Sequence, residues 1–210
     1  MDLSERLRQE LADHPRPREA DEAKHPWLTI LLDTYYTLST GTALAKGAEE
    51  ARRRDKVACV PGCTGCCLRP QVPISQLELL GIWWYFMEKL PEEERARLRE
   101  RLYSHRRSLE CPFLMDARCA IYPLRPLACR FLHVFGSPCK HEEIPVESRP
   151  RDIWFPGEEI IRPAMTTMLV YFGFATPEAA REAWHQDYLL SVSSLMSDFP
   201  WENLATARKK

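Results

Sequence analysis

A dense cysteine cluster constrains the fold of this chain more than any other feature of its sequence. The stretch ACVPGCTGCCL runs from Ala58 to Leu68, and it holds four of the chain's eight cysteines: Cys59, Cys63, Cys66 and Cys67. Cys63 and Cys66 form a CxxC unit with Gly65 in its turn, which is the local arrangement of zinc ribbons, iron–sulfur sites and redox motifs. The remaining cysteines lie in a second segment that is rich in Pro and Gly: Cys111, Cys119, Cys129 and Cys139. The two segments together predict a metal centre.

The context of the cysteines favours metal binding over a disulfide framework. The first residues, up to Pro26, are strongly charged and contain no apolar stretch typical of a signal peptide. We therefore expect a cytoplasmic protein, in which thiols are usually reduced. The net charge of -1 predicts neither a nucleic-acid nor a membrane partner, and an unknown protein partner stays open.

The number of thiols leaves the type of centre open. Four ligands suffice for a zinc ion or for a typical iron–sulfur cluster, so eight cysteines allow one site with spares or two sites. The adjacent pair Cys66 and Cys67 fits one small ion poorly, because consecutive side chains diverge. This favours an iron–sulfur cluster or a binuclear site. A dithiol redox centre and inert buried thiols are the alternatives, and Cys139, His133 and His141 are further candidate ligands.

The rest of the sequence predicts a mostly α-helical fold with an irregular, metal-stapled Cys-rich layer. We expect one globular domain overall, in which 1–56 is an N-terminal helical extension packing on the core. Residues 57–140 form the cysteine-cluster region, and 141–210 form a loop and the C-terminal helices. Ser75 and Glu78 have the spacing of a capping box at the start of a helix whose WWYFM run we assign to the core. The expected helices span 3–13, from 26 onward, 74–90, from 91 onward, 158–172 and 177–197.

A longer pattern extends the cysteine clusters. After CTGCC the chain continues with Cys111-Pro-Phe-Leu, then Cys119 before Ile121 and Tyr122, then Arg125-Pro-Leu-Ala-Cys129-Arg130. This order of residues resembles the CxxCxxCC cysteine-cluster family of YkgJ-like proteins, which are described as zinc- or iron-chelating. The resemblance covers roughly 59–133. Cys59 departs from it, since three residues rather than two separate it from Cys63.

The resemblance implies an iron–sulfur cluster, of the 4Fe-4S type, or zinc as the cofactor. The implied metal ligands are Cys59, Cys63, Cys66, Cys67, Cys111, Cys119 and Cys129. We assign Arg125 and Arg130 to cofactor binding, because they can offset thiolate charge, and the alternative for both is a solvated or carboxylate-paired arginine. Pro126 is placed to open a short helix that carries Cys129, Arg130 and His133. We expect Tyr122 to be a packed ring, and no catalytic residue is assigned.

Three functions remain open from the sequence. The first is a metal or iron–sulfur protein with a redox, sensing or accessory role. The second is an enzyme that uses the centre. Its example is methyl transfer, because flagellin lysine N-methylases are distantly similar and use S-adenosylmethionine, although this chain has no Gly-rich loop for such a donor. The third is a zinc-stapled structural or interaction module.

Overall fold

The computed structural model describes residues 2–60, 62–68, 71–105, 110–140 and 143–208. The described part is mostly helical, which confirms the predicted fold class. The chain divides into two compact units, each built from two separate stretches. Unit 1 is Met1–Lys56 with Phe155–Val192, and unit 2 is Val57–Trp154 with Ser193–Lys210. No helix among the described residues is long and apolar enough to cross a membrane.

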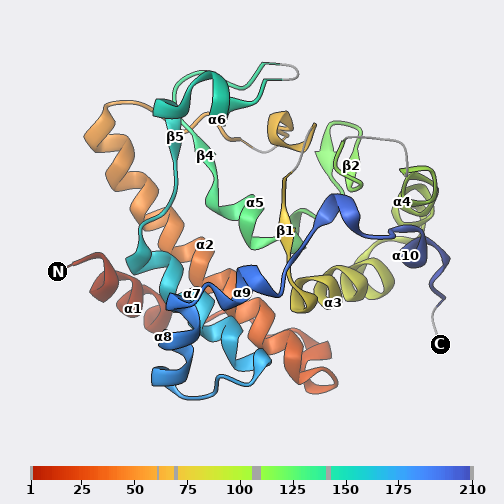
Figure 1. Cartoon of the computed structure of the whole chain (residues 1–210), viewed down its shortest axis with the longest axis horizontal. Coiled ribbons are helices and arrows are strands. Elements are labelled where there is room, and N and C mark those ends of the chain that lie inside the picture. Colours follow the sequence, from red (N-terminus) through yellow and green to blue (C-terminus); the bar gives the residue numbers. More distant parts are fainter. Residues whose placement is uncertain (1, 61, 69–70, 106–109, 141–142, 209–210) are drawn as a thin grey trace. The chain divides into compact units, whose positions relative to one another are not determined.

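Unit 1 is a helical assembly around one long helix (Figure 1). Asp2 caps the first helix with a capping box to Glu5, and Pro26 occupies the first turn of the long helix, as its fixed φ favours. The long helix ends where Arg54 adopts a left-handed conformation, with φ of 55°. Its elements are α1 (Leu3–Asp13), η1 (Ala20–Ala23), α2 (Pro26–Arg53), α7 (Glu158–Leu169), η7 (Val170–Phe172), α8 (Pro177–His185) and α9 (Tyr188–Ser191).

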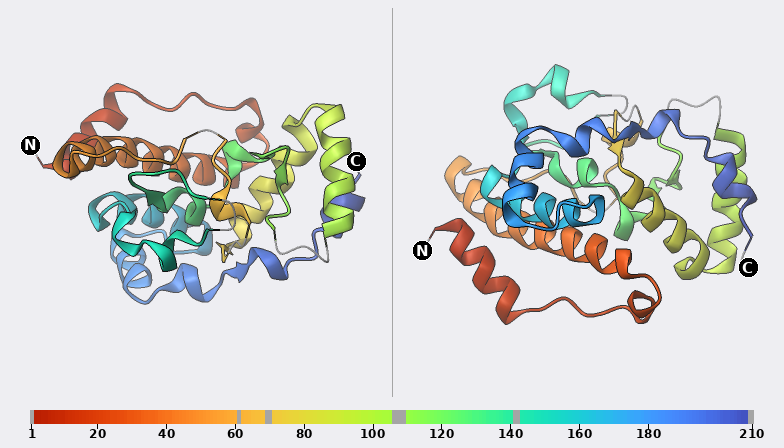
Figure 2. Two further views of the ribbon diagram at one scale, coloured as in Figure 1. Left: turned by 90° about the horizontal axis from the view of Figure 1, so that it is seen from above. Right: turned by 60° about the horizontal axis from the view of Figure 1, so that its bottom comes forward.

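Close packing of α2 against α7 holds unit 1 together. Gly41 lies inside α2 without ending it. A Cβ atom on Gly41 would lie 2.7 Å from Ile160 Cγ2 and 3.2 Å from Leu7 Cδ2. The missing side chain therefore lets α1 and α7 approach the long helix. Figure 2 shows α1 alongside α2, joined to it by the extended segment that precedes η1.

Unit 2 contains the cysteine segments and a core of large apolar side chains. Phe86, Phe113 and Trp201 are buried in it, and the Phe113 and Trp201 rings meet edge to face with centroids 4.7 Å apart. Its helical elements are η2 (Gly65–Cys67), α3 (Gln76–Trp84), η3 (Tyr85–Lys89), α4 (Glu92–Ser104), η5 (Tyr122–Leu124), α5 (Leu127–Phe131), α6 (Pro145–Ser148), η6 (Pro150–Asp152), η8 (Met196–Asp198) and α10 (Glu202–Thr206).

Three short antiparallel pairs connect the loops of unit 2. The pair β1 (Pro73–Ile74) and β6 (Ser194–Leu195) joins Ile74 to Ser194, so the last part of the chain pairs with a strand far back in the sequence. The hairpin of β2 (Leu114–Met115) and β3 (Arg118–Cys119) turns through Asp116 and Ala117, both at positive φ. The third pair is β4 (His133–Val134) with β5 (Ile153–Trp154).

The structure confirms the predicted start of α3 and most of its assigned core. The Ser75 side chain accepts from the Glu78 backbone, and the Glu78 carboxylate accepts from the Ser75 backbone. In the aromatic run that follows, Trp84, Phe86 and Met87 are buried, whereas Trp83 is 44% exposed. The helix passes into a π-helical turn, η3, before it ends at Leu90.

The expected helix over 177–197 is wrong. The helix ends at His185, because Asp187 adopts a left-handed conformation with φ of 51° that a continuous α-helix cannot contain. Beyond the break lie the short α9, strand β6 and η8. The expected helix over 158–172 is present as α7 followed by η7.

Candidate metal centre

The cysteine segments of unit 2 surround one large cavity. It has a volume of about 660 Å³ and lies among η2, the β2–β3 hairpin and α5. Arg125, Tyr122 and Met196 also line it. Six of the eight cysteines face it: Cys63, Cys66, Cys67, Cys111, Cys119 and Cys129. All eight cysteines are free thiols.

Each lining cysteine is placed by a short, hydrogen-bonded piece of backbone. Cys66 and Cys67 lie on the single turn η2, which closes through the Cys67 N–H to the Thr64 carbonyl at 2.8 Å. The Cys111 N–H donates to the Cys67 carbonyl at 2.6 Å, so the two cysteine segments are joined directly. Cys119 ends strand β3, where it pairs with Leu114.

Cys129 is held by α5, whose start is fixed from a distant helix. Pro126 lies at the N-cap of α5, close to its predicted position, and the helix carries Cys129 and Arg130. Oε1 of Glu78 accepts the Leu127 N–H at 2.7 Å, while its other oxygen accepts the Ser75 N–H and hydroxyl. One buried carboxylate therefore caps both α3 and α5. Burial raises the pKa of Glu78.

The thiols facing the cavity interact strongly with one another. Hydrogen bonding to Cys67 and burial raise the pKa of Cys66. Hydrogen bonding to Cys111 raises the pKa of Cys67 to about 12, although the Cys66 thiol acts in the opposite direction. Burial raises the pKa of Cys119 and of Cys129, and neighbouring thiols add to both shifts. In the absence of a cation these thiols hold their protons at neutral pH, and a bound cation would reverse the shifts.

The thiols form two groups, according to which neighbouring thiols shift the pKa of each. Cys66, Cys67 and Cys119 raise the pKa of Cys129, and Cys111 raises the pKa of Cys67. In the second group, burial and the neighbouring Cys63 and Cys59 raise the pKa of Cys139 to about 11. Burial raises the pKa of Cys59, and Cys63 and Cys66 add to the shift. Cys59 therefore lies near thiols of both groups. The first group is therefore Cys66, Cys67, Cys111, Cys119 and Cys129, and the second is Cys59, Cys63 and Cys139.

The second group is built around the turn of the CxxC unit. A Cβ atom on Gly65 would lie 2.5 Å from the Cys139 Cβ, so only glycine permits this approach. The Cys139 sulfur accepts a hydrogen bond from Arg149 Nη2 at 3.7 Å, and the Cys59 sulfur accepts the Val134 N–H at 3.2 Å. Cys139, which the sequence analysis left open as a candidate ligand, thus lies beside Gly65 in the segment that holds the first four cysteines.

Arg125 and Arg130 both lie next to the thiols, but they differ in their contacts. The Arg125 guanidinium lies 4.3 Å from the Tyr122 ring centroid, and it lowers the pKa of several of the neighbouring thiols. Its Nε is buried and has no hydrogen-bond partner among the described residues. Arg130 donates to the carbonyls of Arg125 and Pro123, so its role there is mainly structural. Tyr122, expected as a packed ring, is 47% exposed and supports Arg125.

Of the two candidate histidines, the structure describes only His133. His133 lies in β4 rather than on α5, and its ring packs 5.4 Å from that of Trp154. His141 lies outside the described residues.

The sequence analysis did not predict that Met196 lines the cavity, or that Glu78 also caps the helix that carries Cys129. Met196 comes from η8, and its sulfur lies 3.9 Å from the Cys111 sulfur. Glu78 was recognised only as the capping residue of its own helix. The capping motif gave no sign of the second helix, and nothing around Met196 points to a cysteine far earlier in the chain.

The donor set suits a soft metal centre. Thiolates are the preferred ligands of zinc and of iron–sulfur clusters, and an orphaned guanidinium nitrogen beside them supplies a counter-charge. Within the described residues, no three Cys, His, Asp or Glu side chains already stand in the geometry that holds a metal ion. The thiols line a cavity rather than converge on one point. A metal centre on these thiols would therefore have to draw them together.

A thiol-lined cavity of this kind, on loops with little regular structure, is typical of the class of cysteine-rich, metal-chelating domains. Residues 58–149 match the CxxCxxCC family model, whose description is "Putative zinc- or iron-chelating domain". This matched segment contains every cysteine of the chain. No curated protein and no solved structure matches the chain.

Proposed function

We propose that unit 2 holds an iron–sulfur cluster on the thiols of the first group, and that this centre serves a redox, sensing or accessory role. The observation that carries the proposal is that all five thiols of the first group, together with Cys63, line one cavity of about 660 Å³. The cavity is far larger than a single zinc ion needs, and the adjacent Cys66 and Cys67 both face it. A cluster of several metal atoms can use neighbouring sulfurs that diverge from a single point.

The protein's own residues would hold and tune this centre. Hydrogen bonds link Cys66 to Cys67 and Cys67 to Cys111, and Cys66 also raises the pKa of Cys119 and of Cys129. Arg125 supplies positive charge beside them, which favours thiolates and a more easily reduced centre. The cluster supplies one-electron chemistry when bound, and a redox or accessory role requires a protein partner that receives the electron or the signal.

Anaerobic purification followed by analysis of iron, zinc and sulfide tests the proposal. We expect iron and sulfide in matched amounts with a broad visible absorbance. Cys119→Ser should lose most of the iron, whereas Cys139→Ser, in the second group, should keep it. Iron loss in Cys139→Ser with retention in Cys119→Ser would contradict the assignment of ligands.

A zinc-stapled module is the second candidate, and the short strands of unit 2 favour it. Each of its strands has only two residues, so the backbone alone gives the loops little cohesion. A structural zinc ion stabilises such small loop-rich regions directly. Colourless protein with stoichiometric zinc and no sulfide would establish this function and exclude the iron–sulfur cluster.

A further inference from the structure

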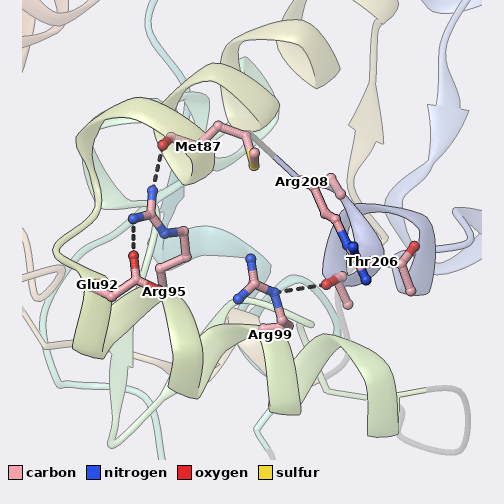
Figure 3. Close-up of a pocket in the computed structure, with 8 residues that line it drawn as sticks. Met87, Glu92, Arg95, Arg99, Thr206 and Arg208 are labelled. Carbon is pink, nitrogen blue, oxygen red and sulfur yellow. Dashed lines mark hydrogen bonds and ion pairs between the residues drawn. The ribbon is translucent and has the colours of Figure 1, made fainter. Parts of the chain in front are cut away.

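A second cavity of unit 2 contains no cysteine and is lined by arginines. It has a volume of about 510 Å³ and lies between α4 and the segment that includes the end of α10 (Figure 3). Arg95 and Arg99 enter it from successive turns of α4, and Arg208 reaches it from the other side. The buried side chains of Met87 and Ala205 form its apolar wall.

The charges in this cavity do not balance. Three guanidinium groups face it, whereas Glu92 is the single carboxylate that lines it. Glu92 pairs with Arg95, which also donates to the Met87 carbonyl. The described residues provide no carboxylate partner for Arg99 or for Arg208. The lining therefore carries two positive charges in excess.

Arg99 differs from the other arginines of the same helix. Arg97 pairs with Asp116, and Arg101 pairs with Glu110 at 2.8 Å. Arg99 instead donates its Nε to the Ala205 carbonyl at 2.9 Å, and its guanidinium lies 5.7 Å from the Phe86 ring centroid. These two contacts fix the side chain and leave its terminal nitrogens, each with two N–H donors, directed to the cavity.

The arginine side chains are preorganised to bind an anion. Guanidinium groups that face one another across a cavity repel, and a bound oxyanion relieves this repulsion while it accepts their fork of donors. Arg95 is held by two bonds and its side chain is only 15% exposed, so little side-chain entropy remains to be lost when a ligand binds. A cavity of this volume is also large enough for a small organic molecule.

We propose that this cavity binds a small organic oxyanion, with its phosphate or carboxylate groups between Arg99 and Arg208 and its apolar part against Met87 and Ala205. The site is separate from the thiol cavity in its lining residues. A test of anion binding here is therefore distinguishable from a test of metal at the thiol cavity.

Titration calorimetry of the full chain at low ionic strength tests the site with two probes, pyrophosphate and citrate. We expect the wild type to bind at least one probe at one site per chain, and the preferred probe distinguishes a phosphate ligand from a carboxylate ligand. Arg99→Gln should weaken binding about tenfold, as expected for loss of one charge-assisted bond.

Arg97→Gln is the matched control, because it removes the same charge from the same helix outside the cavity. It should leave the affinity within about twofold of the wild type. Arg208→Gln gives a second variant in which no described contact is lost, so a defect in it cannot reflect misfolding. Binding of neither probe by the wild type, or equal losses in Arg97→Gln and Arg99→Gln, would overturn the proposal.

Discussion

At the scale of single residues, Glu22 shows how strongly one carboxylate is held in unit 1. Both Arg16 terminal nitrogens donate to it at 2.8 Å, and Thr29 and Arg18 donate as well. Its side chain is 7% exposed. The bonds from Arg16 hold its pKa far below the usual value of 4.5. A lowered folded-state pKa stabilises the fold above pH 4.5, and this contribution is lost as the pH falls below that value.

We expect Glu22→Gln to lower the free energy of unfolding by about 2 kcal/mol near neutral pH, because two arginines lose a buried charged partner. Arg16 keeps Asp33, which limits the loss. Urea unfolding at about pH 7 and about pH 3 measures this effect. The difference in unfolding free energy between wild type and variant should be smaller at the lower pH. An equal difference in unfolding free energy at both pH values would contradict the lowered pKa of Glu22.

At the scale of elements, Gly41 and Gly47 lie on the same helix but have opposite surroundings. Gly41 faces Ile160 and Leu7 at contact distance, whereas nothing lies within 4 Å of a Cβ on Gly47. Gly41→Ala should destabilise the protein by about 1–3 kcal/mol through overpacking. Gly47→Ala should stabilise it by about 0.5–1 kcal/mol, because alanine favours the helix. Thermal unfolding of the two variants measures both effects, and stabilisation by both would contradict the close packing of α2.

Glu78 joins two helices, and its loss should affect both stability and metal content. Glu78→Ala leaves the Leu127 and Ser75 N–H groups without their acceptor, at a cost of about 3 kcal/mol. Because α5 carries Cys129, we also expect less metal per chain. Glu78→Gln keeps one acceptor oxygen and should fall between alanine and the wild type. Normal metal content in a folded Glu78→Ala protein would refute the link from capping to the centre.

The elements that could be predicted are those whose signals are local. The capping box of Ser75 and Glu78 and the proline start of α2 are contained within a few residues, so the sequence is sufficient for them. The break at Asp187 was missed because a non-glycine residue at positive φ gives no clear sequence signal. The second role of Glu78 and the contact of Met196 with Cys111 depend on long-range folding, which no local pattern contains.

The same reasoning applies to the thiols. The spacing predicts a metal site in both cysteine segments, and the family match agrees with that class. The spacing could not divide the thiols into two groups. That division depends on the backbone hydrogen bond from the Cys111 N–H to the Cys67 carbonyl and on the approach of Cys139 to Gly65.

At the scale of the whole molecule, the division into two units predicts unequal dependence on metal. All cysteines lie in unit 2, so removal of the metal should loosen that unit while unit 1 keeps its helical packing. Hydrogen exchange with and without a chelator measures this. We expect faster exchange in η2, the β2–β3 hairpin and α5, and unchanged exchange in α2 and α7. Equal loss of protection in both units, or none in unit 2, would contradict the prediction.

The pairing of β1 with β6 sets an order of assembly during synthesis. The ribosome produces every cysteine of the chain, through Cys139, well before it reaches Ser194 and Met196. The thiols are therefore exposed together on a nascent chain whose cavity still lacks part of its wall. A metal delivered at that stage would enter an open site, and the later arrival of β6 and η8 would close the cavity around it.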